Sequence, residues 1–219
     1  MHFQFLIEDQ SGQILIEQLM QKVQSEHPDI TCNYKAFRGI GGFTKKNTVK
    51  ETKDGKLLND LSTYLAGFDR SLKHIDAAVF IIVDNDDRDT ASFRNELESV
   101  AKSRNITVDH VFCIAVEEIE AWLLGDQSAL LKAYPQAITS RLRSYVQDKI
   151  CGTWEILADA IYPGGISKMK KDNPAYTGIG QKKCEWAREI GKYMDLHNNK
   201  SPSFNYFVTE EQKRAGKAL

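Results

Sequence analysis

Acidic side chains follow three apolar segments of the sequence, and these carboxylates are the groups best suited to do chemistry. Carboxylate oxygens are the ligands that Mg²⁺ and Mn²⁺ prefer in proteins, so acids gathered at one place would hold one of these ions. The three groups are Glu8-Asp9 after residues 3–7, Asp84-Asn85-Asp86-Asp87 after residues 77–83, and Glu117-Glu118-Ile119-Glu120 after residues 111–116.

Within the second group, Asp84 and Asp86 are the main candidates for metal ligands. Alternate residues of an extended strand point to the same face, so these two carboxylates would share a face and repel each other unless a cation lies between them. Asp87 is a further site acid or, like Asp89, a cap of the helix that follows, because Asp is common at helix N-termini. Glu117 has the same two interpretations.

The elements that must position these acids alternate between short apolar strands and amphipathic helices. This alternation predicts an α/β fold with a mostly parallel sheet flanked by helices. Parallel strands place their carboxyl ends at one edge of the sheet, where ligands bind in open α/β folds. The expected strands are 3–7, 30–37, 77–83 and 111–116, and the expected helices include one capped by Ser11 and one over 117–134.

The pattern changes after Pro135, where shorter helical segments replace the strand–helix alternation. Residues 1–135 are therefore predicted to form the α/β domain, and residues 136–219 a helical extension packed on it. The final residues, 210–219, are expected to be frayed or disordered.

Composition excludes several classes of function. The net charge of the 219 residues is −1, so nucleic acid could be bound only through a local basic patch. The four cysteines and five histidines are too scattered for a zinc site. The longest apolar run has seven residues, far fewer than the roughly 20 of a membrane helix. We therefore expect a cytoplasmic protein that does not bind membranes.

Two basic segments could supply the local positive charge. Residues 35–56 contain seven Lys and Arg and two acids, and residues 168–188 contain six and two. They could form a phosphate-binding rim around the acidic site, although a solvated lysine-rich surface has the same composition. The candidate nucleic-acid-binding residues are Lys45, Lys46, Lys170 and Lys171.

The order of these acidic groups resembles the Toprim domain of topoisomerases, primases and OLD-type nucleases. That domain has Glu at the end of its first strand and Asp-x-Asp after a later strand. Further blocks resemble a bacterial Toprim-related family of unknown function along nearly the whole chain. The blocks are Phe-Leu-Ile-Glu-Asp-Gln-Ser-Gly (5–12), Ile-Val-Asp-Asn-Asp-Asp-Arg (82–88), and residues 115–126, 151–165 and 201–207.

The resemblance assigns a role to each matching acid. It implies that Glu8 is the general acid/base or a metal ligand and that Asp84 and Asp86 bind Mg²⁺ or Mn²⁺. Glu118 and Glu120 would be additional acids that line the site.

The activity implied by the resemblance is Mg²⁺-dependent cleavage of phosphodiester bonds in DNA or RNA. A separate ATPase is an implied partner, because relatives with this domain often work beside one and this chain has no ATPase motif. In one departure from the pattern, Asp9 stands where many Toprim sequences have Gly. Two alternatives stay open: a non-catalytic Toprim-like binding or regulatory module, and a small-molecule phosphatase whose Asp-x-Asp-x-Thr motif would have Arg88 in place of Thr.

Overall fold

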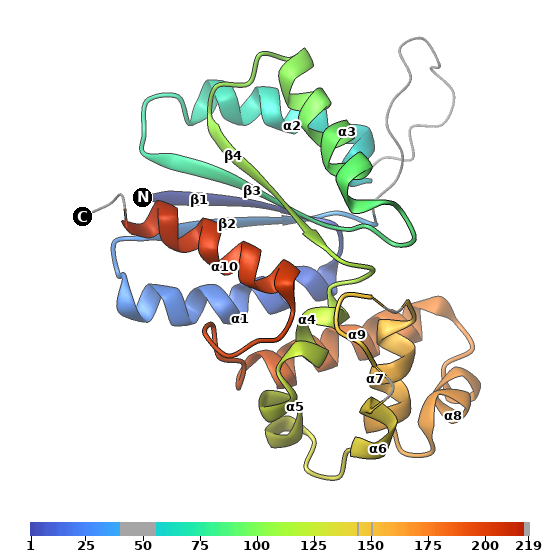
Figure 1. Cartoon of the computed structure of the whole chain (residues 1–219). Coiled ribbons are helices and arrows are strands. Elements are labelled where there is room, and N and C mark those ends of the chain that lie inside the picture. The colour runs from blue at the N-terminus through green and yellow to red at the C-terminus, as the bar shows by residue number, and fades with distance from the viewer. Residues whose placement is uncertain (40–55, 144, 150, 217–219) are drawn as a thin grey trace.

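Four parallel strands form one sheet with the order β2-β1-β3-β4 (Figure 1). The structure is a computed structural model that describes residues 1–39, 56–143, 145–149 and 151–216. The predicted fold class, an α/β fold whose parallel sheet is flanked by helices, is confirmed. The strands are β1 (His2–Ile7), β2 (Thr31–Ala36), β3 (Ala77–Asp84) and β4 (Asp109–Ala115).

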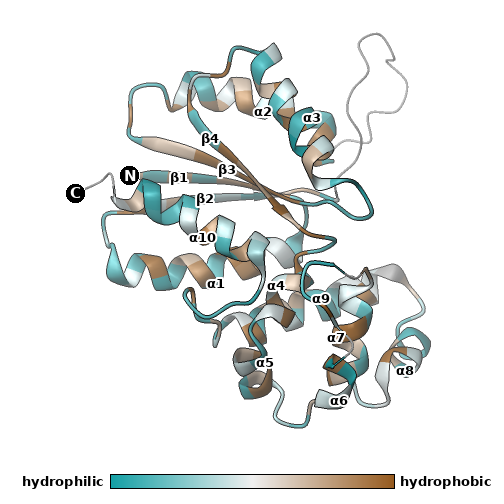
Figure 2. Cartoon of the chain, viewed as in Figure 1, coloured by the Kyte–Doolittle hydropathy of each residue, from teal (hydrophilic) through white to brown (hydrophobic). Residues whose placement is uncertain are grey.

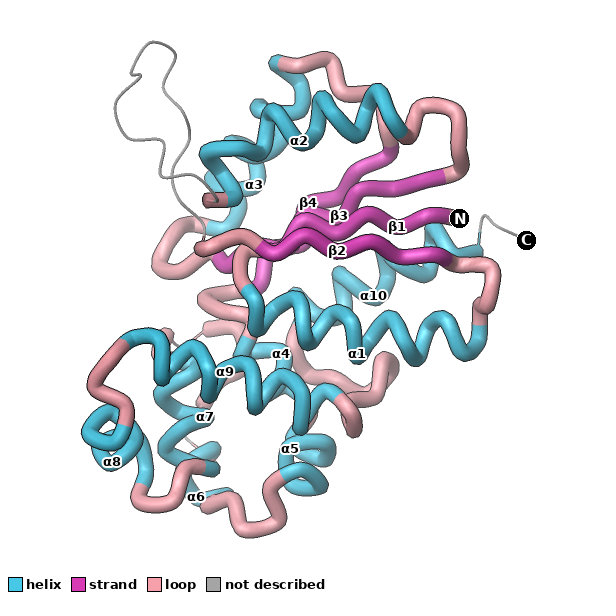
Figure 3. The backbone as a smooth tube through the Cα atoms, turned by 180° about the vertical axis from the view of Figure 1, so that it is seen from behind, coloured by secondary structure: helices cyan, strands magenta, loops and turns pink. Residues whose placement is uncertain are grey.

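Helices cover both faces of the sheet and continue beyond its carboxyl edge (Figures 1 and 3). The helices of the first half are α1 (Gln10–Glu26), α2 (Leu57–Ser71), α3 (Thr90–Ser103), α4 (Glu120–Gly125) and α5 (Gln127–Ala133). Those of the second half are α6 (Thr139–Leu142), α7 (Thr153–Ile161), α8 (Gly165–Asp172), α9 (Tyr176–Gly191) and α10 (Pro202–Ala215).

Side-chain alternation along the strands creates two hydrophobic cores, one on each face of the sheet. On β3, Phe80 and Ile82 face α1, α9 and α10, whereas Ile81 and Val83 face α2 and α3. Burial on both faces explains why β3 is apolar throughout, as its colour in Figure 2 shows. The same alternation directs Asp84, at the end of β3, toward the side of α1 and α9.

The register of the sheet brings the first two acidic groups together. Ile7, the last residue of β1, pairs with Ile82 of β3, and the N–H of Glu8 donates a hydrogen bond to the Ile82 carbonyl at 3.1 Å. Glu8 therefore leaves the sheet beside the last residues of β3. No interaction between the acids is needed for this placement, because the parallel pairing of two apolar strands produces it.

Two expected helix boundaries differ from the structure. Asp9, and not Ser11, caps α1, because its extended backbone lets its carboxylate accept a hydrogen bond from the Gly12 N–H at 2.8 Å. The expected helix over 117–134 is two short helices, α4 and α5. They separate at Asp126, whose carboxylate caps α5 through the Ala129 N–H at 2.9 Å.

The C-terminal helix α10 packs on the sheet, so the expectation that residues 210–219 are frayed is wrong for the residues described, up to 216. Phe207 stacks on Trp122 of α4, with ring centroids 5.4 Å apart. Near the end of the helix, the Arg214 guanidinium donates to both carboxylate oxygens of Asp109 on β4, at 2.8 and 3.0 Å. These contacts depend on residues distant in sequence, which local composition does not reveal.

The helices after residue 135 contact the α/β part directly. Helix α9 lies along α1, and α10 lies beside β4 (Figures 1 and 3). The core that contains Phe3 and Phe80 also contains Trp186 of α9 and Phe204 of α10. Within the described ranges, no helix is long and apolar enough to cross a membrane.

Glu211 of α10 gives the first testable prediction. Its side chain is buried, and burial together with the nearby charge of Glu26 raises its pKa to about 7. Because this carboxyl holds its proton more tightly in the folded chain than in the unfolded chain, the folded state loses stability as pH rises through that pKa. Glu211→Gln should change the free energy of unfolding little at pH 5 and raise it at pH 8, by on the order of 2 kcal/mol. Urea unfolding of both proteins at the two pH values measures this, and a pH-independent difference would contradict it.

Candidate functional site

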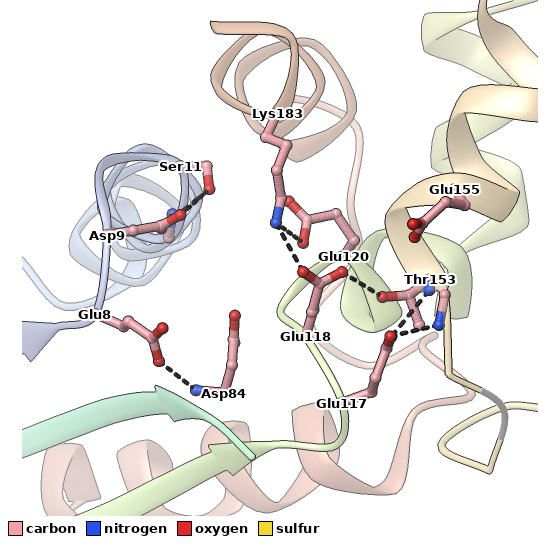
Figure 4. A network of polar contacts seen from close by, with 12 residues as sticks. Glu8, Asp9, Ser11, Asp84, Glu117, Glu118, Glu120, Thr153, Glu155 and Lys183 are labelled. Atoms are coloured by element: carbon pink, nitrogen blue, oxygen red, sulfur yellow. Dashed lines mark hydrogen bonds and ion pairs between the residues drawn. The ribbon is translucent and has the colours of Figure 1, made fainter. Parts of the chain in front are cut away.

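Glu8 and Asp84 form the centre of an acidic site at the carboxyl edge of the sheet (Figure 4). Glu8 Oε2 accepts a hydrogen bond from the backbone N–H of Asp84 at 3.0 Å. This bond orients the Glu8 carboxylate toward the end of β3, where the Asp84 side chain rises beside it. The structure thus brings together two of the three acids that were predicted to converge.

Asp86 does not join this pair. The backbone of Asp86 is left-handed, with φ of 50°, so strand alternation stops at Asp84 and the predicted shared face does not form. Its exposed carboxylate instead forms an ion pair with Arg88 at 2.9 Å. Asp87 is also exposed, in the turn that follows β3, and Asp89 caps α3 by accepting a hydrogen bond from the Ser92 N–H at 2.8 Å. Asp86 and Asp87 are therefore exposed acids outside the Glu8–Asp84 pair, although the charge of Asp86 still acts to raise the pKa of Glu8. A metal-binding role for them stays a prediction.

Glu118 and Glu120 reach the acidic site together with a buried lysine. The ammonium of Lys183, on α9, lies 3.1 Å from Glu118 Oε1 and 3.1 Å from Glu120 Oε2 (Figure 4). The side chain of Lys183 is only 10% exposed and that of Glu120 only 1%. The contact with Glu120 is an ion pair without hydrogen-bond alignment, since Glu120 Oε2 has no hydrogen-bond partner in the described chain.

Glu117 has a structural role that neither of its sequence interpretations contained. Its carboxylate accepts hydrogen bonds from the N–H groups of Gly152 and Thr153, the latter at 2.9 Å, and so caps α7 rather than its own helix. The left-handed backbone of Glu117, with φ of 66°, turns the chain toward α7. The buried side chain of Asn85 accepts a hydrogen bond from the Glu117 N–H, which ties the loop after β4 to the loop after β3.

Burial makes the electrostatics of this site unusual. Loss of hydration raises the pKa of Glu8 to about 7, although the hydrogen bond from Asp84 opposes the shift. Burial and the neighbouring charge of Glu8 raise the pKa of Asp84 well above its usual range. Burial also raises the pKa of Glu120 to about 7, against the attraction of Lys183. These carboxylates favour either protonation or a nearby cation.

Lys183 is already charged in this environment. Burial acts to lower its pKa, but the carboxylates of Glu120, Glu118 and Asp84 outweigh burial and hold the pKa well above its ordinary value. The ammonium therefore neutralises the Glu118 and Glu120 side of the site. In the described ranges, no Lys or Arg forms an ion pair with Glu8 or Asp84.

Sequence reasoning missed Lys183, although a signal for it exists. Trp186, Ala187 and Ile190 follow it at spacings of three, four and seven residues, and all three are buried. Lys183 therefore occupies the apolar face of α9. A lysine on such a face requires a buried acidic partner.

None of the four predicted basic residues belongs to the acidic cluster as the structure describes it. Lys45 and Lys46 lie outside the described residues. Lys170 lies on α8, with its ammonium 3.8 Å from Glu155 of α7 and 5.1 Å from the centre of the Trp154 ring. Lys171 is exposed on the same helix. Lys170 thus contacts α7, the helix whose first N–H groups bond to Glu117.

The chemistry of Glu8 and Asp84 fits a hard divalent cation. Among the described residues, no group of three or more His, Cys, Asp or Glu side chains could hold an ion alone. Mg²⁺ does not need such a group, because it typically binds one or two carboxylates and takes its other ligands from water and phosphate. Glu8 and Asp84 are the two carboxylates that would hold it.

Replacement of Lys183 by Met gives the second prediction. The change should lower the free energy of unfolding by about 3 kcal/mol at pH 8, because Glu118 and Glu120 would lose their buried cation. The loss should be smaller at pH 5, where these acids can take up protons. Adding Glu120→Gln to Lys183→Met should restore part of the stability at pH 8. Denaturant unfolding of the two single variants and the double variant tests this, and strictly additive effects would refute the coupling.

Comparison with known proteins adds a family but no function. The family described as a domain of unknown function, DUF4276, matches residues 7–210, a range that includes every acid of the site. No curated protein and no solved structure matches the chain. Because the match spans nearly the whole sequence, the chain belongs to the DUF4276 family.

Proposed function

We propose that this protein is a Toprim-like, Mg²⁺-dependent enzyme that cleaves phosphodiester bonds in DNA or RNA. The observation that carries the proposal is the Glu8–Asp84 pair, in which two partly buried carboxylates meet at the carboxyl edge of a parallel sheet and, among the described residues, no Lys or Arg forms an ion pair with either. Such a pair is costly to the folded chain unless it binds a cation. The order of the acids along the chain, as in Toprim domains, supports the same assignment.

The residues around the pair have separate tasks in this proposal. A bound Mg²⁺ supplies positive charge to the phosphate oxygens. Glu8, with one oxygen fixed by the Asp84 N–H, is oriented to accept a proton from an attacking water. Lys183 neutralises Glu118 and Glu120, and it holds α9 over the site so that bulk water has less access.

Nucleic acid is the proposed substrate because basic side chains lie on segments that adjoin the acidic site. Lys170 contacts α7, whose first N–H groups bond to Glu117, and Lys171 is exposed beside it. Arg38 and Lys56 lie close to each other at the carboxyl edge of the sheet, and the Gly39 N–H bonds to the Glu8 carbonyl. Phosphate groups could bind these cations while one phosphodiester reaches Glu8 and Asp84. A separate ATPase stays a proposed partner.

A non-catalytic binding module is the second candidate, and the observation that favours it is the position of Lys183. An ammonium between Glu118 and Glu120 provides a permanent internal cation for half of the acidic cluster. A protein that binds a partner without catalysing a reaction could use the Lys183 ion pairs only to stabilise the fold at this edge of the sheet. Activity measurements separate the two candidates.

The third prediction concerns Asp84→Asn. This variant should abolish Mg²⁺-dependent or Mn²⁺-dependent cleavage and should remove the increase in melting temperature that Mn²⁺ gives the wild type. Without metal at pH 8 it should be more stable than the wild type, because a buried repulsion is lost. For a chain of this length, each kcal/mol gained raises the melting temperature by about 2–4 °C. Cleavage of labelled oligonucleotides and thermal melting with and without Mn²⁺ measure both effects.

Asp76→Asn is the matched control, since Asp76 is an exposed acid immediately before the other end of β3. It should keep the activity and the Mn²⁺ response of the wild type. Loss of stability in Asp84→Asn without metal would contradict the proposed cost of the pair. Wild-type protein that binds Mn²⁺ but cleaves no DNA or RNA would favour the binding module.

The fourth prediction concerns the lysines of α8. Lys170→Glu combined with Lys171→Glu should weaken binding to single-stranded DNA or RNA and should reduce the slope of log affinity against log salt by about 1–2. Lys73→Glu with Lys102→Glu is the control, because both lysines are exposed near the amino edge of the sheet. Fluorescence anisotropy over a salt series measures these slopes. Equal slopes for the two double variants would place the nucleic acid elsewhere.

A further inference from the structure

A cavity borders α9 on a face that adjoins the one carrying Lys183. Its volume is about 560 Å³, within the range of small-molecule sites in proteins. Residues from the ends of α5 and α7 and from α8 and α9 line it. Lys182, Glu185 and Trp186 of α9 belong to this lining, whereas their neighbour Lys183 faces the carboxylates. The cavity is therefore separate from the Glu8–Asp84 pair.

The lining of the cavity is rich in residues with rings. Tyr134 and Tyr162 are partly exposed, Pro135 and Pro163 are exposed, and Trp186 belongs to the lining although it is only 2% exposed. Aromatic side chains bind planar ligands by stacking, a contact worth about 1–3 kcal/mol for each nucleic-acid base on an aromatic ring. The chemistry of the lining thus favours a planar ring over a flexible chain.

Hydrogen-bond donors and hydrogen-bond acceptors both border the cavity. Lys168 pairs with Asp172 at 2.7 Å, and Lys182 pairs with Glu185 at 2.7 Å. The Tyr162 hydroxyl donates to Asp172 at 2.9 Å. Donors and acceptors are therefore both present, and the two positive and two negative charges cancel. A ligand of high net charge therefore gains little electrostatic attraction from this border. A neutral ring with its own donors and acceptors can form hydrogen bonds with the donors and with the acceptors of the border.

The hydroxyl of Tyr134 is a further polar group in this region. It is buried and has no hydrogen-bond partner in the described chain. An unpaired buried hydroxyl costs about 1–3 kcal/mol, and a rotation of the side chain toward a ligand in the cavity would remove that cost. The nearby acids Glu185 and Glu189 of α9 act on this hydroxyl electrostatically, which places it beside the helix that lines the cavity.

We propose that this cavity binds a nucleobase. A nucleobase is planar, neutral and edged with donors and acceptors, which matches the stacking walls and the balanced polar border. The base could belong to a free nucleoside or to an unpaired nucleotide of a single strand. The second source rests on the proposed function, with the exposed cation of Lys171 on α8 available to the strand's phosphates.

The test uses uncharged nucleosides as probes and a substitution that fills the cavity. Isothermal titration with adenosine, guanosine, cytidine and uridine should give dissociation constants on the order of 0.1–1 mM for at least one of them. Ribose should not bind. Ala137→Trp places a large side chain in the lining and should weaken nucleoside binding at least tenfold. Ile138→Trp, at an exposed position outside the lining, should leave the affinity within twofold of wild type.

A second variant protects the test against misfolding. Tyr162→Leu removes one aromatic wall and should also weaken binding, and thermal melting of each variant shows whether it is folded. Failure of the wild type to bind any nucleoside at millimolar concentration would overturn the proposal. Unchanged affinity in folded Ala137→Trp would also overturn it.

Oligonucleotides distinguish the two sources of the base. If the base belongs to a strand, Ala137→Trp should weaken the affinity for a single-stranded oligonucleotide more than for its duplex, and nucleosides should compete with the single strand. If the ligand is a free nucleoside, strand affinity should not change. Asp84→Asn should keep nucleoside binding in either case. Wild-type protein that binds a nucleoside but cleaves no DNA or RNA would contradict the proposed enzyme and still support the cavity.

Discussion

The constraint on which this structure depends is the burial of more carboxylates than cations at one edge of the sheet. Glu8, Asp84, Glu118 and Glu120 all have a raised pKa, and burial is the largest cause for each. The ammonium of Lys183 balances part of this charge and joins α9 to the loop after β4. Ionic groups taken out of water rarely stabilise a fold compared with apolar groups of the same size. An arrangement of this kind is consistent with a binding role and is difficult to explain by stability alone.

The polar loops at this edge form a continuous set of tertiary contacts. Asn85 bonds to the Glu117 N–H, and Glu117 bonds to the first N–H groups of α7. A left-handed backbone at a residue other than glycine costs about 1–2 kcal/mol, and at Glu117 several hydrogen bonds compensate for that cost. The acid that local rules assign to its own helix therefore holds the start of another helix, 36 residues further along the chain.

The strands, and the acids placed at their ends, could be predicted from the sequence because they depend on the pattern of apolar residues. The runs 77–83 and 111–116 identify β3 and β4, and parallel pairing of β1 with β3 then places Glu8 beside Asp84. The position of Asp86 could not be predicted, because it depends on one backbone angle in a turn. Lys183 belongs to a distant helix, and its partners are set by how α9 packs on α1, which periodicity alone does not specify. The roles proposed for these residues are chemical hypotheses that the fold permits.

The position of helix α9 has one further consequence, because the helix borders both the proposed nucleobase cavity and the carboxylate cluster. Successive residues, Lys182 and Lys183, face the nucleobase cavity and the carboxylate cluster respectively. A displacement of the helix large enough to alter one environment would alter the other, because a helical backbone moves as a unit over one turn. Binding of a ligand in the cavity and binding of a cation at the carboxylates would then be thermodynamically linked. Such a coupling is reciprocal, so a ligand that changes the affinity for the cation has its own affinity changed by the cation by the same factor.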